Sequence, residues 1–203
     1  MPPSSPPPDD LPLILAAQRG DLDSFNGLVT RYQNVAYTVA YRLLGEPFAA
    51  ADAAQDAFIS AYRKIREYRG GSFKAWLLRI VTNTAYDQIR YDQRRPATGI
   101  EDLPGAEYDD GPPLASDDVL PEDAAEQRDT QQVIQDCLQT LPADQRLTLV
   151  MFDMQDYSYQ EIAEANDVQL GTVKSRLSRA RLGMRRCLEG KRELFDAPRR
   201  LDS

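Results

Sequence analysis

A run of short polar and cationic side chains between residues 172 and 179 could bind duplex DNA. Serine and threonine are short enough to let a helix backbone approach the bases closely, and arginine can form two hydrogen bonds with guanine. Neighbouring basic side chains can hold phosphates. The candidate residues are Thr172, Lys174, Ser175, Arg176, Ser178 and Arg179. The alternative is an amphipathic surface helix with a solvated basic face, which is what charge runs usually are.

These residues belong to a predicted helix-turn-helix between Asp156 and Gly190. Ser158 and Glu161 have the spacing of a capping box, which predicts that a short helix starts there. Because Asn and Asp favour turns, residues 166–168 predict a break before a second helix. In that second helix an apolar stripe recurs at helical spacing and leaves the candidate residues to the opposite face and its edges. The stripe consists of Val173, Leu177, Ala180, Met184 and Leu188.

Histidine is absent from the 203 residues, and the only cysteines are Cys137 and Cys187. The commonest general base and metal ligand is therefore missing, and two separated cysteines make no ordinary zinc site. We expect no catalytic residue, no metal and no cofactor. The Pro-rich start, free of Lys and Arg, is unlike a secretory signal, so we expect a cytoplasmic protein whose cysteines are reduced and packed in helices. No apolar run approaches the length of a membrane span, and no membrane contact is expected.

A net charge of −8 is unfavourable for binding DNA, which is itself negatively charged. The negative charge, however, is concentrated in one segment of the chain. Between residues 97 and 130, eleven acidic residues stand against Arg128 alone, so this segment carries −10 and the rest of the chain +2. For nucleic-acid binding, the distribution of charge matters more than its total.

The first half of the chain predicts a helical domain. Apolar residues keep helical spacing from Phe25 to Leu43, and a second helix rich in alanine follows Pro47. Residues 69–72 form a loop with two adjacent glycines, and a third helix runs from Phe73 to Arg95. Basic side chains alternate with aromatic ones around this loop, a composition that suits single-stranded nucleic acid. Alternatively, the tyrosines near this loop only fill gaps at the rim of the domain and bind no nucleic acid.

We therefore predict an all-α protein with two small helical domains joined by an acidic flexible linker. The predicted segments are a disordered tail at 1–10, a first domain at 11–96, the linker at 97–130, a four-helix domain with the helix-turn-helix at 131–190, and a tail at 191–203.

Two separated blocks of the sequence resemble the extracytoplasmic-function sigma factors of bacterial RNA polymerase. The first block, which resembles their region 2, comprises Ala51 to Phe58, Tyr68 to Phe73, Trp76 to Ile80, and Asn83. The second, which resembles region 4, comprises Leu141-Pro142, Tyr159 to Ala163, and Gly171 to Arg181. Asp156 departs from the pattern, since many relatives carry glycine there.

The resemblance implies a dissociable specificity subunit that binds core RNA polymerase and promoter DNA. Region 2 would bind the polymerase clamp through Asp52, Gln55 and Asp56. It would also capture an unstacked base of the minus-10 element in a pocket formed by Lys64, Tyr68, Gly70, Gly71, Ser72 and Asn83. Region 4 would read the minus-35 element through the candidate residues of the second helix. An anti-sigma factor is an expected further partner.

Two other functions remain as alternatives at this point. One is a helix-turn-helix regulator that acts without polymerase and whose first domain senses a ligand or dimerises. The other is a helical-bundle metalloprotein, which the absence of histidine disfavours.

Overall fold

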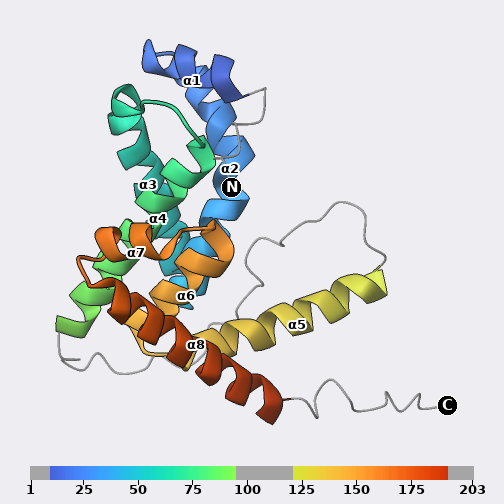
Figure 1. Ribbon diagram of the computed structural model, residues 1–203. Coiled ribbons are helices and arrows are strands. Elements are labelled where there is room, and N and C mark those ends of the chain that lie inside the picture. Colours follow the sequence, from blue (N-terminus) through green and yellow to red (C-terminus); the bar gives the residue numbers. More distant parts are fainter. Residues whose placement is uncertain (1–9, 95–120, 192–203) are drawn as a thin grey trace. The chain divides into compact units, whose positions relative to one another are not determined.

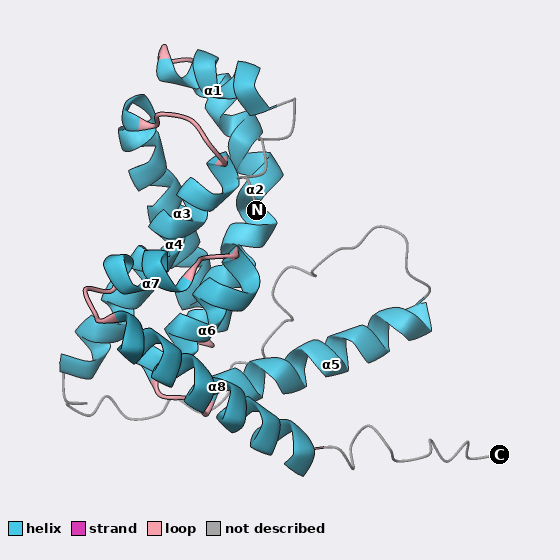
Figure 2. Cartoon of the chain, in the orientation of Figure 1, coloured by secondary structure: helices cyan, strands magenta, loops and turns pink. Residues whose placement is uncertain are grey.

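The computed structural model describes residues 10–94 and 121–191. Within these ranges the chain forms α-helices and one short 3-10 helix, joined by loops and without a strand (Figure 2). The predicted all-α class is confirmed. The helices form two compact units, one containing α1 to α4 and the other α5 to α8.

Over residues 10–94 the first unit consists of four α-helices, coloured blue to green in Figure 1, and one short 3-10 helix. Its elements are α1 (Asp10–Gln18), α2 (Leu22–Leu44), α3 (Pro47–Lys64), the 3-10 helix η1 (Ile65–Glu67) and α4 (Phe73–Arg94). The predicted helices over Phe25 to Leu43, after Pro47, and from Phe73 are all present. Helices α2, α3 and α4 pack against one another, and α1 packs against α2.

Small residues let the helices of this unit approach closely. Ala36 and Ala40 of α2, Ala57 and Ala61 of α3, and Ala85 of α4 are fully buried. Larger apolar side chains fill the remaining core at full burial: Leu28, Val39, Leu43, Leu77 and Val81. Because alanine combines the highest helix propensity with a small side chain, it satisfies both the local structure and the packing.

The chain reverses sharply between α2 and α3. Gly45 ends α2 in the left-handed conformation, with φ 81°, and its amide donates to Tyr41 O. The carboxylate of Glu46 then accepts from the amides of Phe48 and Ala49, while Pro47 occupies the first turn of α3. Glycine is common directly after a helix, and proline is common in the first turn of a helix.

The predicted boundary between tail and first domain is wrong at Asp10. This residue begins α1 and is fully buried. Its carboxylate accepts hydrogen bonds from Arg31 and from the hydroxyl of Tyr32. A buried carboxylate is tolerated when it is paired in this way. Both partners lie more than 20 residues away, so helical periodicity could not reveal them.

The second unit contains α5 (Pro121–Gln139), α6 (Ala143–Gln155), α7 (Tyr159–Ala165) and α8 (Leu170–Gly190). Four helices were predicted here, but α5 begins ten residues before the predicted domain boundary at 131. The predicted extended linker is therefore wrong for residues 121–130. Pro121 at the first turn and Ala124-Ala125-Glu126-Gln127 favour a helix, and this local propensity outweighs the acidic composition. Residues 97–120 of the predicted linker lie outside the described residues.

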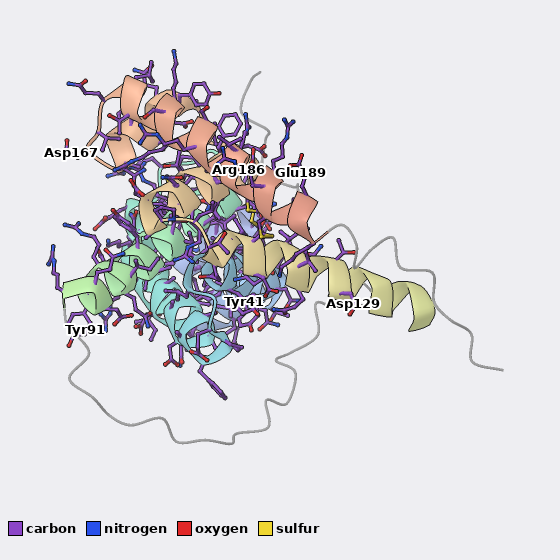
Figure 3. The ribbon with its side chains drawn as sticks, turned by 90° about the horizontal axis from the view of Figure 1, so that it is seen from below. Tyr41, Tyr91, Asp129, Asp167, Arg186 and Glu189 are labelled. Atoms are coloured by element: carbon purple, nitrogen blue, oxygen red, sulfur yellow. A yellow bond between two sulfur atoms is a disulfide. The ribbon has the colours of Figure 1, made fainter. Side chains whose placement is uncertain are left out.

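The prediction of reduced cysteines is also wrong. Cys137 of α5 and Cys187 of α8 form a disulfide, with their Cα atoms 5.6 Å apart (Figure 3). Nearby, Lys191 Nζ donates to Asp136 Oδ2 at 2.6 Å, and this bond holds the pKa of that carboxyl below its usual value. A separation of 50 residues gave no indication of pairing. It is the packing of α5 against α8 that brings the two sulfurs within bonding range.

Reduction of this disulfide should selectively destabilise the second unit. We expect the free energy of unfolding of that unit to fall by about 4 kcal/mol, because the closed loop no longer constrains the unfolded chain. The chain has a single tryptophan, Trp76, which lies in the first unit. In urea with and without dithiothreitol, circular dichroism should show an earlier transition, while the tryptophan fluorescence transition stays in place. A shift of both transitions, or of neither, would contradict this expectation.

Candidate nucleic-acid interface

The predicted helix-turn-helix is present in the second unit as α7 and α8. Ser158 begins α7 with the predicted capping box: its hydroxyl accepts from Glu161 N, and the Glu161 carboxylate accepts from Ser158 N at 2.8 Å. The turn contains Asp167 in the left-handed region, with φ 51°, a conformation that Asp tolerates better than most residues. Asp156 ends α6 in the same conformation, with φ 56°. Glycine adopts this conformation more readily than a residue with a side chain.

The apolar stripe of α8 holds the helix against its neighbours. Val173, Leu177 and Ala180 are buried at 2% exposure or less. Leu177 and Ala180 join a core cluster to which α5, α6 and the loop between them contribute Leu138, Leu149 and Leu141. One turn beyond Ala180, a Cβ added to Gly183 would come within 2.6 Å of the Leu141 side chain, so glycine permits a close approach there. The predicted orientation of α8 is confirmed.

Three of the six candidate residues of α8 face solvent. Lys174, Ser178 and Arg179 are exposed, and within the described part of the chain none of these side chains has a hydrogen bond or ion pair. Their donors are therefore available to a ligand. This small, cationic face has the size and chemistry that fit a helix into the major groove.

The other three candidates are partly engaged within the protein. Arg176 Nε lies 2.9 Å from Asp144 Oδ2 in the first turn of α6, and the arginine side chain is only 22% exposed. The hydroxyl of Ser175 donates to Thr172 O at 2.9 Å. Thr172 is itself half-buried. The sequence could not separate these residues from the exposed ones, because the separation depends on how α6 packs against α8.

The loop between η1 and α4 brings together most of the predicted minus-10 residues. Gly70 and Gly71 have φ values of 109° and 93°, a backbone conformation that favours glycine, and a Cβ at either would meet no atom within 4 Å. Their role is thus conformational rather than steric. Ser72 follows them and caps α4, its hydroxyl accepting from Ala75 N at 3.2 Å.

Tyr68 supports this loop from beneath. Its ring centroid lies 5.4 Å from that of Trp76 and 5.8 Å from that of Phe73, and the residue is only 8% exposed. Its hydroxyl donates to Gly71 O at 2.7 Å. Burial raises the pKa of this phenol, and the charge of Asp10 raises it further. The tyrosine therefore shapes the loop, while the exposed atoms at this place belong mainly to Gly70, Gly71 and the half-buried Ser72.

Asn83 and Lys64 are exposed. Asn83 lies on α4 seven residues beyond Trp76, about two helical turns along the same face. Further along this face, the guanidinium carbon of Arg90 lies 5.8 Å from the ring centroid of Tyr86. Basic residues are exposed before the loop and along α4 after it: Arg63, Arg66 and Arg69 precede the loop, and Arg79, Arg90 and Arg94 follow along the helix. The predicted mixture of bases and aromatic rings is thus present on the surface of this unit.

Asp52, Gln55 and Asp56 are all exposed on one face of α3, and within the described residues none of their side chains has a hydrogen bond or ion pair. The structure adds two apolar residues that the sequence analysis missed. Phe48 is 71% exposed and Ile59 is 43% exposed, and helical spacing places both beside the polar residues. The alternation of charge with exposed apolar area is typical of a protein-binding surface. The sequence held one signal for them, since Phe48 and Ile59 lie at helical spacing from Asp52 and Gln55 and so share their face.

Within the described ranges, no cluster of three or more His, Cys, Asp or Glu side chains could hold a metal ion. No described helix combines the length and apolar character that crossing a membrane requires.

Family models match both units. The model of sigma-70 region 2 matches residues 28–95, and that of sigma-70 region 4 matches residues 131–183. The two matched segments define the class of protein: an RNA polymerase sigma factor.

Comparison with individual proteins shows to which family of sigma factors the chain belongs. The ECF RNA polymerase sigma-E factor of Haemophilus influenzae is 36% identical over 176 residues, which cover 85% of this chain and 91% of that protein. The RNA polymerase sigma-H factor of Pseudomonas aeruginosa is 34% identical over 181 residues, covering 89% of this chain and 94% of the relative. The chain therefore belongs to the extracytoplasmic-function family of RNA polymerase sigma factors.

Two solved structures share the fold. The sigma factor RpoE of Bartonella quintana, in complex with the anti-sigma factor NepR, has a TM-score of 0.58 and 25% identity, with 83% of this chain and 98% of that chain covered. CnrH in complex with the cytosolic domain of CnrY has a TM-score of 0.56 and 24% identity, with coverage of 89% and 97%. The protein is thus a promoter-specific initiation factor that binds RNA polymerase, and a polymerase-independent regulator is not favoured.

Arg176 is ion-paired whereas Lys174 and Arg179 are exposed, so their substitutions should affect stability differently. Arg176→Ala should lower the free energy of unfolding of the second unit by about 0.5–1 kcal/mol, because a half-buried ion pair and its packing are lost. Lys174→Ala and Arg179→Ala should change it by less than about 0.5 kcal/mol, as exposed positions do. Urea unfolding followed by circular dichroism checks all three variants. Equal losses for the three would refute the distinction.

Proposed function

We propose that the two units read two promoter elements for polymerase, with the exposed face of α8 on the minus-35 duplex and the loop between η1 and α4 on the unpaired minus-10 strand. Such a protein contributes binding and specificity, and it performs no covalent chemistry of its own. The observation that carries the proposal is the free cationic face of α8, in which Lys174 and Arg179 lack protein partners within the described residues.

In the minus-35 contact, Arg179 and Ser178 would meet base edges, because they lie opposite the buried stripe. Lys174, at the edge of that face, would hold a phosphate. Arg176 would contribute a phosphate contact only by leaving Asp144, and we assign it chiefly to positioning α8. Thr172 and Ser175 would face the duplex near the start of the helix.

In the minus-10 contact, an extruded base needs a surface to lie on and a polar group that reads its edge. Gly70, Gly71 and Ser72 would supply the wall, and the exposed amide of Asn83 would pair with the base. Lys64 would hold the backbone. Tyr68 would keep the wall in place through its bond to Gly71 O, rather than offer its own buried ring.

For the polymerase contact we propose the face of α3 that carries Asp52, Gln55 and Asp56, extended by the exposed Phe48 and Ile59. We further propose that the protein is cytoplasmic, where polymerase is found, and that an anti-sigma factor regulates it. The support for this last partner is that the similar RpoE was solved in complex with the anti-sigma factor NepR.

The proposal is tested by mixing the purified chain with bacterial core polymerase. We expect the two to co-elute, and the mixture to transcribe specific fragments from a pool of genomic DNA that core polymerase alone does not select. Free chain should bind the recovered promoters poorly in a gel shift, since its segment 97–130 carries −10. A chain that binds those fragments equally well without polymerase would contradict the proposal.

Arg179 and Lys174 should respond differently to substitution. Arg179→Ala should cost roughly 1–3 kcal/mol on the preferred minus-35 sequence and relax preference at one position, because a base contact is lost. Lys174→Ala should weaken binding to every sequence alike and lower the salt slope by about one unit. Holoenzyme affinity across minus-35 variants at several salt concentrations separates the two. If Arg179→Ala weakens all sequences equally, the residue contacts only the backbone.

The acidic face of α3 should govern polymerase binding. We expect the double substitution Asp52→Ala with Asp56→Ala to weaken core binding about tenfold, because two charges of one interface are lost. The matched control is Asp87→Ala with Asp92→Ala, which removes two exposed acids from α4 and should leave core binding unchanged. Titration of core polymerase with labelled chain measures both. An equal effect of the two pairs would indicate a general charge effect instead.

A further inference from the structure

Helix α1 reaches the loop between η1 and α4 through its last residue. The side-chain amide of Gln18 donates to Ile65 O at 3.0 Å and to Tyr68 O at 2.9 Å. These carbonyls stand at the start and just after the end of η1. One half-buried amide therefore fixes both ends of the turn that leads into Gly70 and Gly71.

The other end of α1 is fixed as well. The buried carboxylate of Asp10 accepts from Arg31 and Tyr32 of α2. Between the two ends, Ile14 and Ala17 are buried at 2% exposure or less. Because α1 is held along its whole length, Gln18 does not merely touch the loop; it joins the loop to a rigid body.

An aromatic cluster connects the same elements. The ring of Tyr32 lies 5.6 Å from that of Phe73, and Phe73 lies 5.8 Å from Tyr68 and 5.5 Å from Trp76. The partner of Asp10 is thus two ring contacts away from the single tryptophan of the chain. Any shift of Tyr68 changes the surroundings of Trp76, whose ring centroid is 5.4 Å from it.

We propose that Gln18 is a positioning residue for the minus-10 site, and that its two hydrogen bonds set the place of Tyr68 and of the loop wall beyond it. The inference rests on the proposed function of this loop. It concerns a helix that precedes the matched region 2 segment at 28–95 and to which the sequence analysis assigned no role.

The test uses Gln18→Met, which keeps the length of the side chain and removes both donors, and Gln18→Glu, which keeps its shape and also removes them. Leu15→Ala is the matched control, since Leu15 lies on the same helix and is 44% exposed. Tyr68→Ala serves as the reference for the proposed site. Full-length variants are assembled with core polymerase on the recovered promoter fragments, and promoter opening is measured by permanganate reactivity.

Both Gln18 variants should bind core polymerase normally and lower promoter opening about tenfold, as the loss of two neutral hydrogen bonds would. The emission of Trp76 in the free protein should change in both variants and stay unchanged in Leu15→Ala. This fluorescence readout needs no DNA, so it reports on the loop independently of the function assigned to it.

Three results would overturn the inference in different ways. Normal opening in the Gln18 variants with impaired opening in Tyr68→Ala would remove Gln18 and leave the minus-10 site intact. Normal opening in all variants, Tyr68→Ala included, would refute the proposed site itself. A loss of core binding equal to the loss of opening in both Gln18 variants would show that Gln18 supports only the fold of the unit.

Discussion

A helix that buries one stripe of its surface has only its remaining faces for binding, and this constraint determines where function can lie in both units. In α8, burial of Val173, Leu177 and Ala180 leaves Lys174, Ser178 and Arg179 in solvent. In α3, burial of Ala50, Ala54, Ala57 and Ala61 leaves the face that carries Asp52, Gln55 and Asp56. The packing that folds each unit also selects the residues that meet its partners.

Local chemistry explains why so much of this arrangement could be predicted from sequence. The capping box of Ser158 and Glu161, the break around Asp167 and the paired glycines before α4 each depend on residues within a few positions of one another. Helical periodicity then assigned the buried stripe of α8 correctly, because a stripe is a property of one helix and needs no knowledge of its neighbours.

The features that escaped prediction all depend on contacts between distant segments. Asp10 was assigned to a tail because its partners lie on α2, and the cysteines were expected to be reduced because only the packing of α5 on α8 brings them together. The same limit applied within the site. Helical spacing placed Arg176 at the edge of the basic face and Arg179 opposite the buried stripe, but it could not show that Asp144 pairs with Arg176, while Arg179 has no side-chain partner among the described residues. Tyr68 was expected to help form the pocket for an unstacked base, but its side chain is buried and supports the loop through its bond to Gly71 O.

The central claim is that the two units contact two different promoter elements in one polymerase complex. Site-specific photocrosslinking measures this most directly, with a photoreactive side chain at position 83 in one preparation and at position 179 in another. In the open complex we expect position 83 to crosslink to the unpaired strand near the minus-10 element and position 179 to crosslink to the duplex near the minus-35 element. Crosslinks from both positions to the same element, or equal crosslinking when core polymerase is omitted, would contradict the account.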